Sequence, residues 1–295
     1  MAALIIAIVN PKGGVGKSST VAAMAAGLTA KKYRTLIIDL TPDGYCTYAT
    51  GVNIADETPT VFDILTNAKK LSDAIVQTPI GDILPASARL DDMNTIVSAA
   101  GDDYTLNRVL APVRKKYDYI LIDTPPSFRV LTINALAAAT GVIIPVSVDI
   151  FGLNSIHNVN NIIESVRKYT HRPLKIYGIL LTRYTPRVVL MRGLTKTAIE
   201  IARQIKTAVF KTYIRECIAI SHALNMQKSI FQYAPKSNGA KDYAALVTEF
   251  LKLTTKKLPA ETSPTRRQTK RLELNVTVAP LTIEIHCHKK ISQKP

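Results

Sequence analysis

The sequence has no tryptophan, only 6% aromatic residues and three cysteines in 295 residues. Because Cys46, Cys217 and Cys287 are odd in number and far apart, a disulfide framework or a tetrathiolate metal site is not expected. Acidic residues are also scarce, with 22 Asp and Glu against 38 Lys and Arg, for a formal net charge of +16. This balance suits a polyanionic partner, either nucleic acid or an acidic membrane face, and the simplest location is a reducing cytoplasm.

Long apolar runs are absent too. The weakly polar stretch Ile133–Val148 contains a glycine and a proline and falls short of the ~20 apolar residues of a membrane helix. The apolar start Leu4–Val9 follows no basic residue and leads into a Gly/Lys loop, which argues against a secretory signal. We therefore expect no transmembrane segment. The 47% hydrophobic content is still enough for a substantial core.

Short β-branched runs alternate with segments that have apolar residues at helical spacing. The runs are almost continuously apolar, as in parallel strands covered on both faces. Predicted strands cover Leu4–Val9, Thr35–Ile38, Tyr119–Ile122, Val142–Val148 and Ile176–Leu181. Predicted helices cover Ser18–Lys32, Thr105–Lys116, Asn154–Tyr169, Gly193–Lys206 and Ala240–Lys256. This order predicts an α/β domain over residues 1–255, with a doubly wound, mostly parallel sheet and helices on both faces.

The composition changes after residue 255. Residues 256–295 are polar and Pro-containing, with nine Lys and Arg against three Asp and Glu. We predict a basic C-terminal tail, partly disordered, with one strand interrupted at Pro280. Alternation along such a strand would put His286 and His288 on one face, but two imidazoles without further ligands make an incomplete metal site.

A glycine-rich segment with two lysines follows the first predicted strand and opens the first predicted helix. There, backbone N–H groups and the helix dipole favour phosphate oxygens, Lys17 would neutralise phosphate and Ser18 would hold Mg²⁺. Pro11 stands where the standard phosphate-loop pattern has its first glycine, and a second lysine, Lys12, follows it. The alternative is a glycine-rich turn with two surface lysines. The predicted cofactor-binding residues here are Lys12, Gly13, Gly14, Val15, Gly16, Lys17, Ser18 and Ser19.

Asp123 follows the buried run Tyr119–Ile122 directly. The carboxyl ends of parallel strands open into the ligand crevice of such a sheet, where an aspartate can hold Mg²⁺ through a water. An aspartate ending a strand can equally cap a helix. Together with the phosphate loop, the position favours the magnesium role.

Three segments carry a family resemblance: Lys12–Ser18, Asp39–Gly44 and Asp123–Ser127. They resemble the P-loop ATPases with a deviant Walker A motif of the ParA/Soj partition family, within the wider MinD/ParA group. The similarity extends over about residues 1–255. It continues through residues 131–136, 149–153, 178–182, 209–212 and 233–240.

This resemblance implies a DNA partition ATPase that uses ATP and Mg²⁺. It implies a homodimer when ATP is bound, in which Lys17 binds phosphate in its own subunit and Lys12 reaches the partner's ATP. It also implies non-specific DNA binding by that dimer, and release when a ParB-like centromere-binding partner stimulates hydrolysis. The expected location is the cytoplasm, on DNA or the nucleoid. The predicted Mg²⁺ ligands, partly through water, are Ser18, Asp39 and Asp123.

Two departures from the family pattern affect hydrolysis and base recognition. Thr41 stands where the family usually has an aspartate that orients the hydrolytic water, so turnover should be slow. Either Asp43 or Asp39 could take that role, and Asp43 could instead be a plain turn residue before Gly44. Near the base pocket, Arg215 is the predicted nucleotide contact, in a segment that lacks the family's usual proline.

The DNA-binding prediction rests on cations that fall in one stretch with few acidic residues. Clustered cations supply sequence-independent affinity by displacing condensed counterions, although solvated helix faces explain many single lysines. The predicted DNA-binding residues are Arg183, Arg187, Arg192, Lys196, Arg203 and Lys206.

Two other functions remain open. A MinD-like membrane-cycling ATPase would need an amphipathic C-terminal helix, against which Pro259, Pro264 and Pro280 argue. A nucleotide-dependent DNA-binding scaffold with impaired hydrolysis is suggested by Thr41. The sequence does not identify the cargo, which could be a plasmid, a virus or a chromosome.

Overall fold

The structure is a computed structural model, and it describes residues 2–54, 58–93 and 104–254. The predicted basic tail, its strand and its two histidines therefore lie outside the described residues. None of the described helices is both long and apolar enough to cross a membrane.

A six-stranded parallel sheet forms the centre of the described fold, in the order β3-β2-β4-β1-β5-β6. Because consecutive strands are parallel, the chain returns through helices between them. The strands are β1 (Leu4–Ile8), β2 (Thr35–Asp39), β3 (Asp82–Leu84), β4 (Tyr119–Asp123), β5 (Gly141–Ser147) and β6 (Lys175–Thr182).

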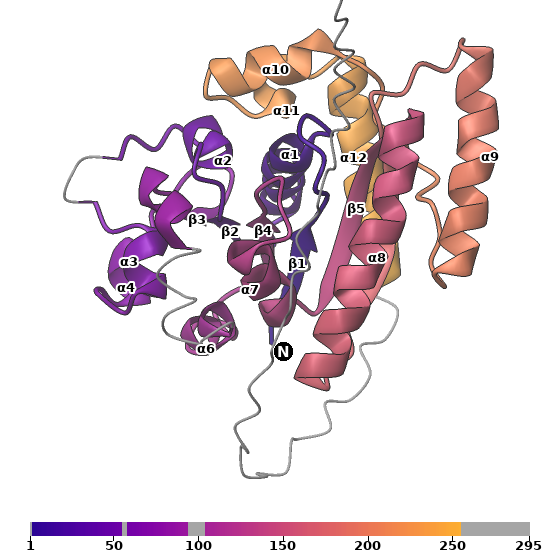
Figure 1. The fold of residues 1–295 in the computed structure, drawn as a ribbon. Helices are drawn as coiled ribbons and strands as arrows, with labels where there is room; N and C mark the ends of the chain where they lie inside the picture. Colours follow the sequence, from indigo (N-terminus) through magenta and orange to yellow (C-terminus); the bar gives the residue numbers. More distant parts are fainter. Residues whose placement is uncertain (1, 55–57, 94–103, 255–295) are drawn as a thin grey trace, which may run out of the picture. The chain divides into compact units, whose positions relative to one another are not determined.

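Helices cover both faces of this sheet (Figure 1). On β1, Ile5 and Ala7 pack into one core, whereas Ile6 and Ile8 pack into the other, as the alternation of side chains along a strand requires. Helices α1, α10, α11 and α12 contribute to the second core, and α3, α6, α7, α8 and α9 contribute to the first. The helices are α1 (Lys17–Ala30), α2 (Tyr45–Ala49), α3 (Val61–Leu65), α4 (Leu71–Ala74), the 3₁₀ helix η1 (Ala88–Asp92), α6 (Thr105–Leu110), α7 (Val130–Ala138), α8 (Ile150–Thr170), α9 (Val189–Gln204), α10 (Ile218–Asn225), α11 (Ile230–Tyr233) and α12 (Asn238–Thr254).

The predicted α/β architecture is confirmed, and all five predicted strands are present. The predicted helix over Thr105–Lys116 is wrong in its second half, because α6 ends at Leu110. Pro112 explains this end, since a proline lacks the N–H that would continue the helical hydrogen bonds. Helix α7 and the three-residue strand β3 were not predicted.

Polar side chains gather where the strands end. Asp39 and Asp123 are the last residues of β2 and β4, and they are direct partners in the register of the two strands. Ser147 and Thr182 end β5 and β6, and Asn10 follows β1. Polar side chains from five different strands therefore meet at the carboxyl edge of the sheet, where ligands bind in such folds.

Candidate nucleotide site

The loop between β1 and α1 has the backbone of a phosphate-binding loop. Gly14 and Gly16 have φ angles of 72° and 85°, in the left-handed region where residues with a Cβ are strained. Gly16 is the N-cap of α1, and no side chain caps that end. The first N–H groups of α1 and its dipole are thus available to an anion.

Lys17 is buried at the start of α1 and held by the loop itself. Its Nζ donates a hydrogen bond to the carbonyl oxygen of Lys12 at 3.2 Å. Burial lowers the pKa of Lys17, and the nearby Asp123 partly offsets this. Because the buried ammonium of Lys17 makes no hydrogen bond to an anion among the described residues, it is suited to bind a phosphate.

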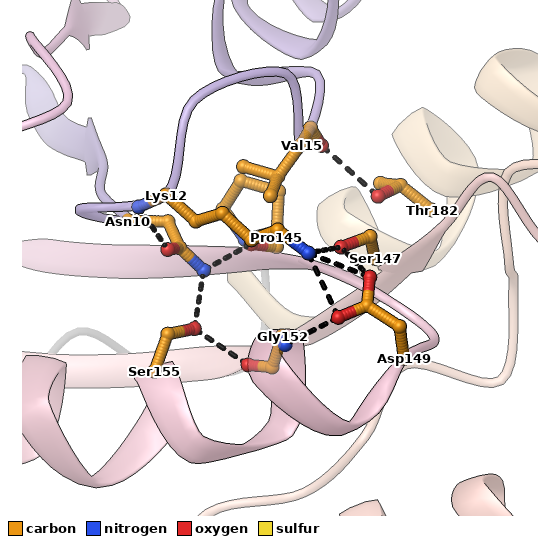
Figure 2. Close-up of polar contacts among 9 residues, drawn as sticks. All are labelled: Asn10, Lys12, Val15, Pro145, Ser147, Asp149, Gly152, Ser155 and Thr182. Atoms are coloured by element: carbon orange, nitrogen blue, oxygen red, sulfur yellow. Dashed lines mark hydrogen bonds and ion pairs between the residues drawn. The ribbon is translucent and has the colours of Figure 1, made fainter.

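The side chain of Lys12 has a different environment, in contact with the segment that follows β5. Its Nζ lies 2.7 and 2.8 Å from the two oxygens of Asp149, and 3.0 Å from Oγ of Ser147 (Figure 2). The two charged side chains are 35% and 41% exposed. Burial raises the pKa of Asp149, but hydrogen bonds from Lys12, Ser147 and the N–H of Gly152 outweigh it and lower the pKa to about 2.

Asn10 connects the phosphate loop to β5 and α8, as Figure 2 shows. Its buried amide donates to the carbonyl of Pro145 at 2.8 Å and to Oγ of Ser155 at 2.9 Å. Its oxygen accepts the N–H of Lys12 at 2.8 Å. The loop is also held from β6, because the Thr182 hydroxyl donates to the carbonyl of Val15 at 2.9 Å. The sequence analysis did not predict that Asn10 and Thr182 hold the loop. A polar residue at the end of an apolar strand is the sequence signal that could have indicated this role.

The glycine at position 152 lets α8 start close to β5, which places the Asp149 carboxylate within hydrogen-bond distance of Lys12. A Cβ at Gly152 would lie 2.1 Å from the carbonyl oxygen of Ser147, so only glycine allows α8 to start this close to β5. Asp149 caps α8 by accepting the Gly152 N–H at 2.7 Å. The same carboxylate therefore caps a helix and pairs with Lys12.

Asp123 is fully buried, and neither of its oxygens has a hydrogen-bond partner within the described residues. Burial, followed by the charge of Asp39, raises the pKa of Asp123 to about 8. Ser18, Lys17 and the Thr124 N–H oppose this rise, but none makes a hydrogen bond of ordinary geometry to the carboxylate. An unpartnered buried carboxylate is costly, and a divalent cation would offset that cost.

Asp39 is fully buried as well, but its carboxylate is satisfied. Oδ1 accepts the N–H and hydroxyl of Thr41 at 3.0 and 2.6 Å, and Oδ2 accepts those of Thr47 at 2.8 and 2.9 Å. Burial raises the pKa of Asp39, and these hydrogen bonds oppose the rise. Four donors fill the acceptor positions of a carboxylate. These contacts hold the loop after β2, and the predicted metal and catalytic roles of Asp39 stay predictions.

Thr41 begins a tight turn, in which the Gly44 N–H bonds to the Thr41 carbonyl at 3.0 Å. Pro42 and Asp43 occupy the two central positions, where proline suits the first. Asp43 is exposed in this turn. The structure therefore gives Asp43 the geometry of a turn residue, at the edge of the site and facing solvent.

Arg215 is committed to another partner. Its Nη2 lies 2.6 Å from Oδ1 of Asp242, its Nε lies 2.9 Å from Oδ2, and its backbone N–H bonds to the same Oδ2 at 2.9 Å. These three contacts with Asp242 fix the segment that precedes α10 against helix α12. The predicted nucleotide contact of Arg215 is therefore not supported by this geometry.

The six predicted DNA-binding residues are all exposed. Arg183 forms an ion pair with Glu216 at 3.0 Å. The other five have no ion-pair partner among the described residues. On α9, Arg192, Lys196 and Arg203 fall on one stripe roughly 40° wide at 100° per residue, and the stripe is about 17 Å long. The helix buries a different face, through Ala198, Ile201 and Ala202.

Comparison with known proteins shows which family the sequence resembles. A family model described as an AAA domain matches residues 3–176. The sporulation initiation inhibitor protein Soj of Bacillus subtilis is 36% identical over 248 residues, which are 83% of this chain and 97% of that protein. The chromosome partitioning protein ParA of Myxococcus xanthus is 32% identical over 258 residues, which are 86% of this chain and 90% of that protein.

A solved structure is similar over nearly the whole described fold. It is the cobyrinic acid a,c-diamide synthase of Mycobacterium smegmatis with a bound ATP analogue and magnesium. The two chains share 30% identity with a TM-score of 0.75, and the match covers 86% of this chain and 96% of that one.

Proposed function

Because the chain belongs to the ParA/Soj family of partition ATPases, we propose that it is an ATP-dependent DNA partition protein that cycles between a free monomer and a DNA-bound dimer. The chain is an ATPase that uses ATP and Mg²⁺. Dimerisation, DNA binding and stimulation by a ParB-like partner are the proposed parts of the cycle. Its place would be the cytoplasm, on DNA or the nucleoid.

The described residues fit ATP and Mg²⁺. The bare glycine loop and the buried Lys17 suit the phosphates, and the unpartnered carboxylate of Asp123 suits a hydrated Mg²⁺ with Ser18 beside it. When bound, Mg²⁺ supplies charge neutralisation at the phosphates. Asp39 keeps Thr41 and Thr47 in place around this pocket.

The different positions of the two lysines carry the proposal. Lys17 is buried and fixed toward its own loop, whereas Lys12 is partly exposed and held by one ion pair at the rim. Two ammonium groups that bind one phosphate would repel each other if the anion did not lie between them. In the dimer, Lys12 would leave Asp149 and bind the γ-phosphate of the partner's ATP.

Release from DNA requires hydrolysis, which we expect to be slow. The Thr41 hydroxyl donates to Asp39 at 2.6 Å, so it is occupied and is in any case a weak base. This observation also favours a second candidate, a nucleotide-dependent DNA-binding scaffold with impaired hydrolysis. The two differ only in whether the partner protein accelerates phosphate release.

Sedimentation velocity with ATP, with ADP and without nucleotide tests the proposal. We expect a dimer in ATP alone, and Lys12→Ala should bind nucleotide through Lys17 yet stay monomeric. The matched control is Lys31→Ala, which removes an exposed lysine at the far end of α1. A Lys12→Ala protein that dimerises as well as the parent would show that Lys12 does not act across the interface.

Phosphate release measured with and without duplex DNA then separates the two candidates. Addition of a ParB-like partner from the same genome should raise turnover if the protein cycles. A dimer that stays on DNA at an unchanged turnover would identify the scaffold instead.

A further inference from the structure

The first turn of α9 exposes apolar side chains among arginines. Val189 is 81% exposed and Leu190 is 65% exposed, and Val188 precedes them with 40% exposure. We call these three residues the apolar tip. Isolated exposed apolar residues are ordinary, but three in succession at one end of a helix mark an interaction site.

The tip is held firmly at its base. Thr185–Val188 form a turn closed by the Val188 N–H and the Thr185 carbonyl at 3.1 Å, with Pro186 at its second position. Tyr184 anchors this turn, because its backbone pairs with Ile214 and Glu216 and its ring lies 4.3 Å from that of Tyr213. The tip therefore projects from a fixed base, with little entropy left to lose on binding.

Along the sequence, the charge around the tip is of one sign, and Glu216, whose N–H bonds to Tyr184, is paired with Arg183. Arg187 and Arg192 flank it and have no ion-pair partner in the described part of the chain. The sequence holds no Asp or Glu from residue 165 to residue 199. The partner of such a surface must be anionic and must also accept apolar side chains.

We propose that the apolar tip contacts the bases of duplex DNA, with Arg187 and Arg192 on the adjoining phosphates, and so adds a salt-independent part to the affinity. The inference rests on the proposed DNA binding and deepens it. One or two aliphatic side chains are enough to contact or wedge a base step in the minor groove, when cations hold the backbone on either side.

Two other occupants fit less well. In a symmetric contact between two copies, the tip would meet its own arginines, and like charges would oppose each other. Binding in a membrane surface takes an apolar face along a helix, but the apolar face of α9 is buried against the core at Ala198, Ile201 and Ala202. Only duplex DNA matches both the charge and the small apolar area.

The test uses the full chain with ATP, a ~30 bp duplex of arbitrary sequence and fluorescence anisotropy at several salt concentrations. The double variant Val189→Ser/Leu190→Ser should bind about tenfold more weakly at every salt concentration, because the apolar contact is lost. The slope of log affinity against log salt should not change, since no phosphate contact is removed. In contrast, Arg187→Ala/Arg192→Ala should reduce that slope by about two.

Leu253→Ser is the matched control, because it replaces a 41% exposed leucine near the end of α12. Its affinity should equal that of the parent. Circular dichroism and basal ATPase rate verify that each variant is folded. Equal affinity of the tip variant and the parent would overturn this inference alone, whereas a parent that does not bind DNA would overturn the proposed function with it.

Two further measurements distinguish the other occupants. Loss of ATP-dependent dimerisation in the tip variant would assign the tip to a contact between copies. Loss of binding to vesicles of phosphatidylserine and phosphatidylcholine, at unchanged DNA affinity, would assign it to a membrane. Either result overturns the inference.

Discussion

The pocket at the carboxyl edge of the sheet and the exposed face of α9 are both polar, yet they are built in opposite ways. In the pocket, Asp39 accepts four hydrogen bonds and Asn10 makes three. On α9, Arg192, Lys196 and Arg203 have no ion-pair partner among the described residues. A pocket for chemistry needs fixed geometry, whereas a surface for a polyanion needs only charge at suitable spacing.

This difference predicts two kinds of mutational response. Residues that share one hydrogen-bonded network are non-additive, so a single change in the pocket should remove most of the activity. Separate surface cations should contribute in graded and nearly additive amounts.

The largest effect is expected from Asp123→Asn. Removing the carboxylate should lower the Mg²⁺-dependent hydrolysis rate at least ~100-fold, because the amide no longer supplies an anionic ligand. The same change should leave the free energy of unfolding of the nucleotide-free protein about equal at neutral pH, because burial raises the pKa of Asp123 to about 8 and a mostly uncharged carboxyl is replaced by an uncharged amide. Phosphate release and urea unfolding of one preparation measure both effects.

Asp39→Asn is the matched variant on the neighbouring strand. Its amide N–H₂ would face donors from Thr41 or Thr47, so the free energy of unfolding should fall by about 2 to 3 kcal/mol. If Asp39→Asn is as stable as the parent and lacks only hydrolysis, Asp39 takes part in the reaction and the loop-holding role is wrong.

The second effect concerns the stripe on α9. Replacing Arg192, Lys196 and Arg203 by alanine should reduce the slope of log affinity against log salt by about three, at an unchanged basal ATPase rate. Single variants should each lower the slope by about one. Lys31, Lys69 and Lys252, which are exposed on other parts of the fold, form the control triple. If a single α9 variant abolishes DNA binding, the cations of α9 do not contribute in graded, nearly additive amounts, and the contrast with the hydrogen-bonded pocket is wrong.

The sequence constrains the phosphate loop more tightly than the surface for a physical reason. The phosphate loop needs glycine at positive φ, a lysine and a hydroxyl at fixed spacing, so its backbone geometry constrains the residue types. Asp123 was predicted as the magnesium residue because it ends a buried strand, and its unpartnered carboxylate supports that role.

Partners of long sequence separation could not be predicted in this way. Asp149 pairs with Lys12 across 137 positions, and Asp242 holds Arg215 from another helix. Asp39 was interpreted as a ligand because its spacing resembles a motif, but the fold supplies it with Thr47 as a donor. Such contacts depend on which elements pack together, and that information is not local.

The third prediction concerns the loop after β2. Thr41→Asp should raise phosphate release severalfold, because it restores a carboxylate beside the nucleotide. Asp43→Ala should leave turnover at the parental rate, because Asp43 is an exposed turn residue and its change costs only some stability. Both rates are measured with DNA present. A slow Asp43→Ala protein that stays bound to DNA would show that Asp43 has taken over the role of the missing aspartate.

The smallest effect is expected at the pair of Lys12 and Asp149, which belongs to the pocket but is about as exposed as a surface ion pair. Asp149→Asn keeps the helix cap and removes the charge, since asparagine caps as well as aspartate. Without nucleotide at pH 7, the loss in the free energy of unfolding should be ~0.5 kcal/mol or less, because solvent screens the pair.

The pH dependence of this loss follows from the pKa of Asp149. The folded pKa of about 2 lies below the ordinary value near ~3.9, so the charge stabilises the protein above about pH 4. This contribution is lost as pH falls toward the folded pKa, so the difference between parent and variant should be smaller at pH 3 than at pH 7. Urea unfolding at both pH values measures it, and a difference that grows on acidification would contradict the assignment of the ion pair.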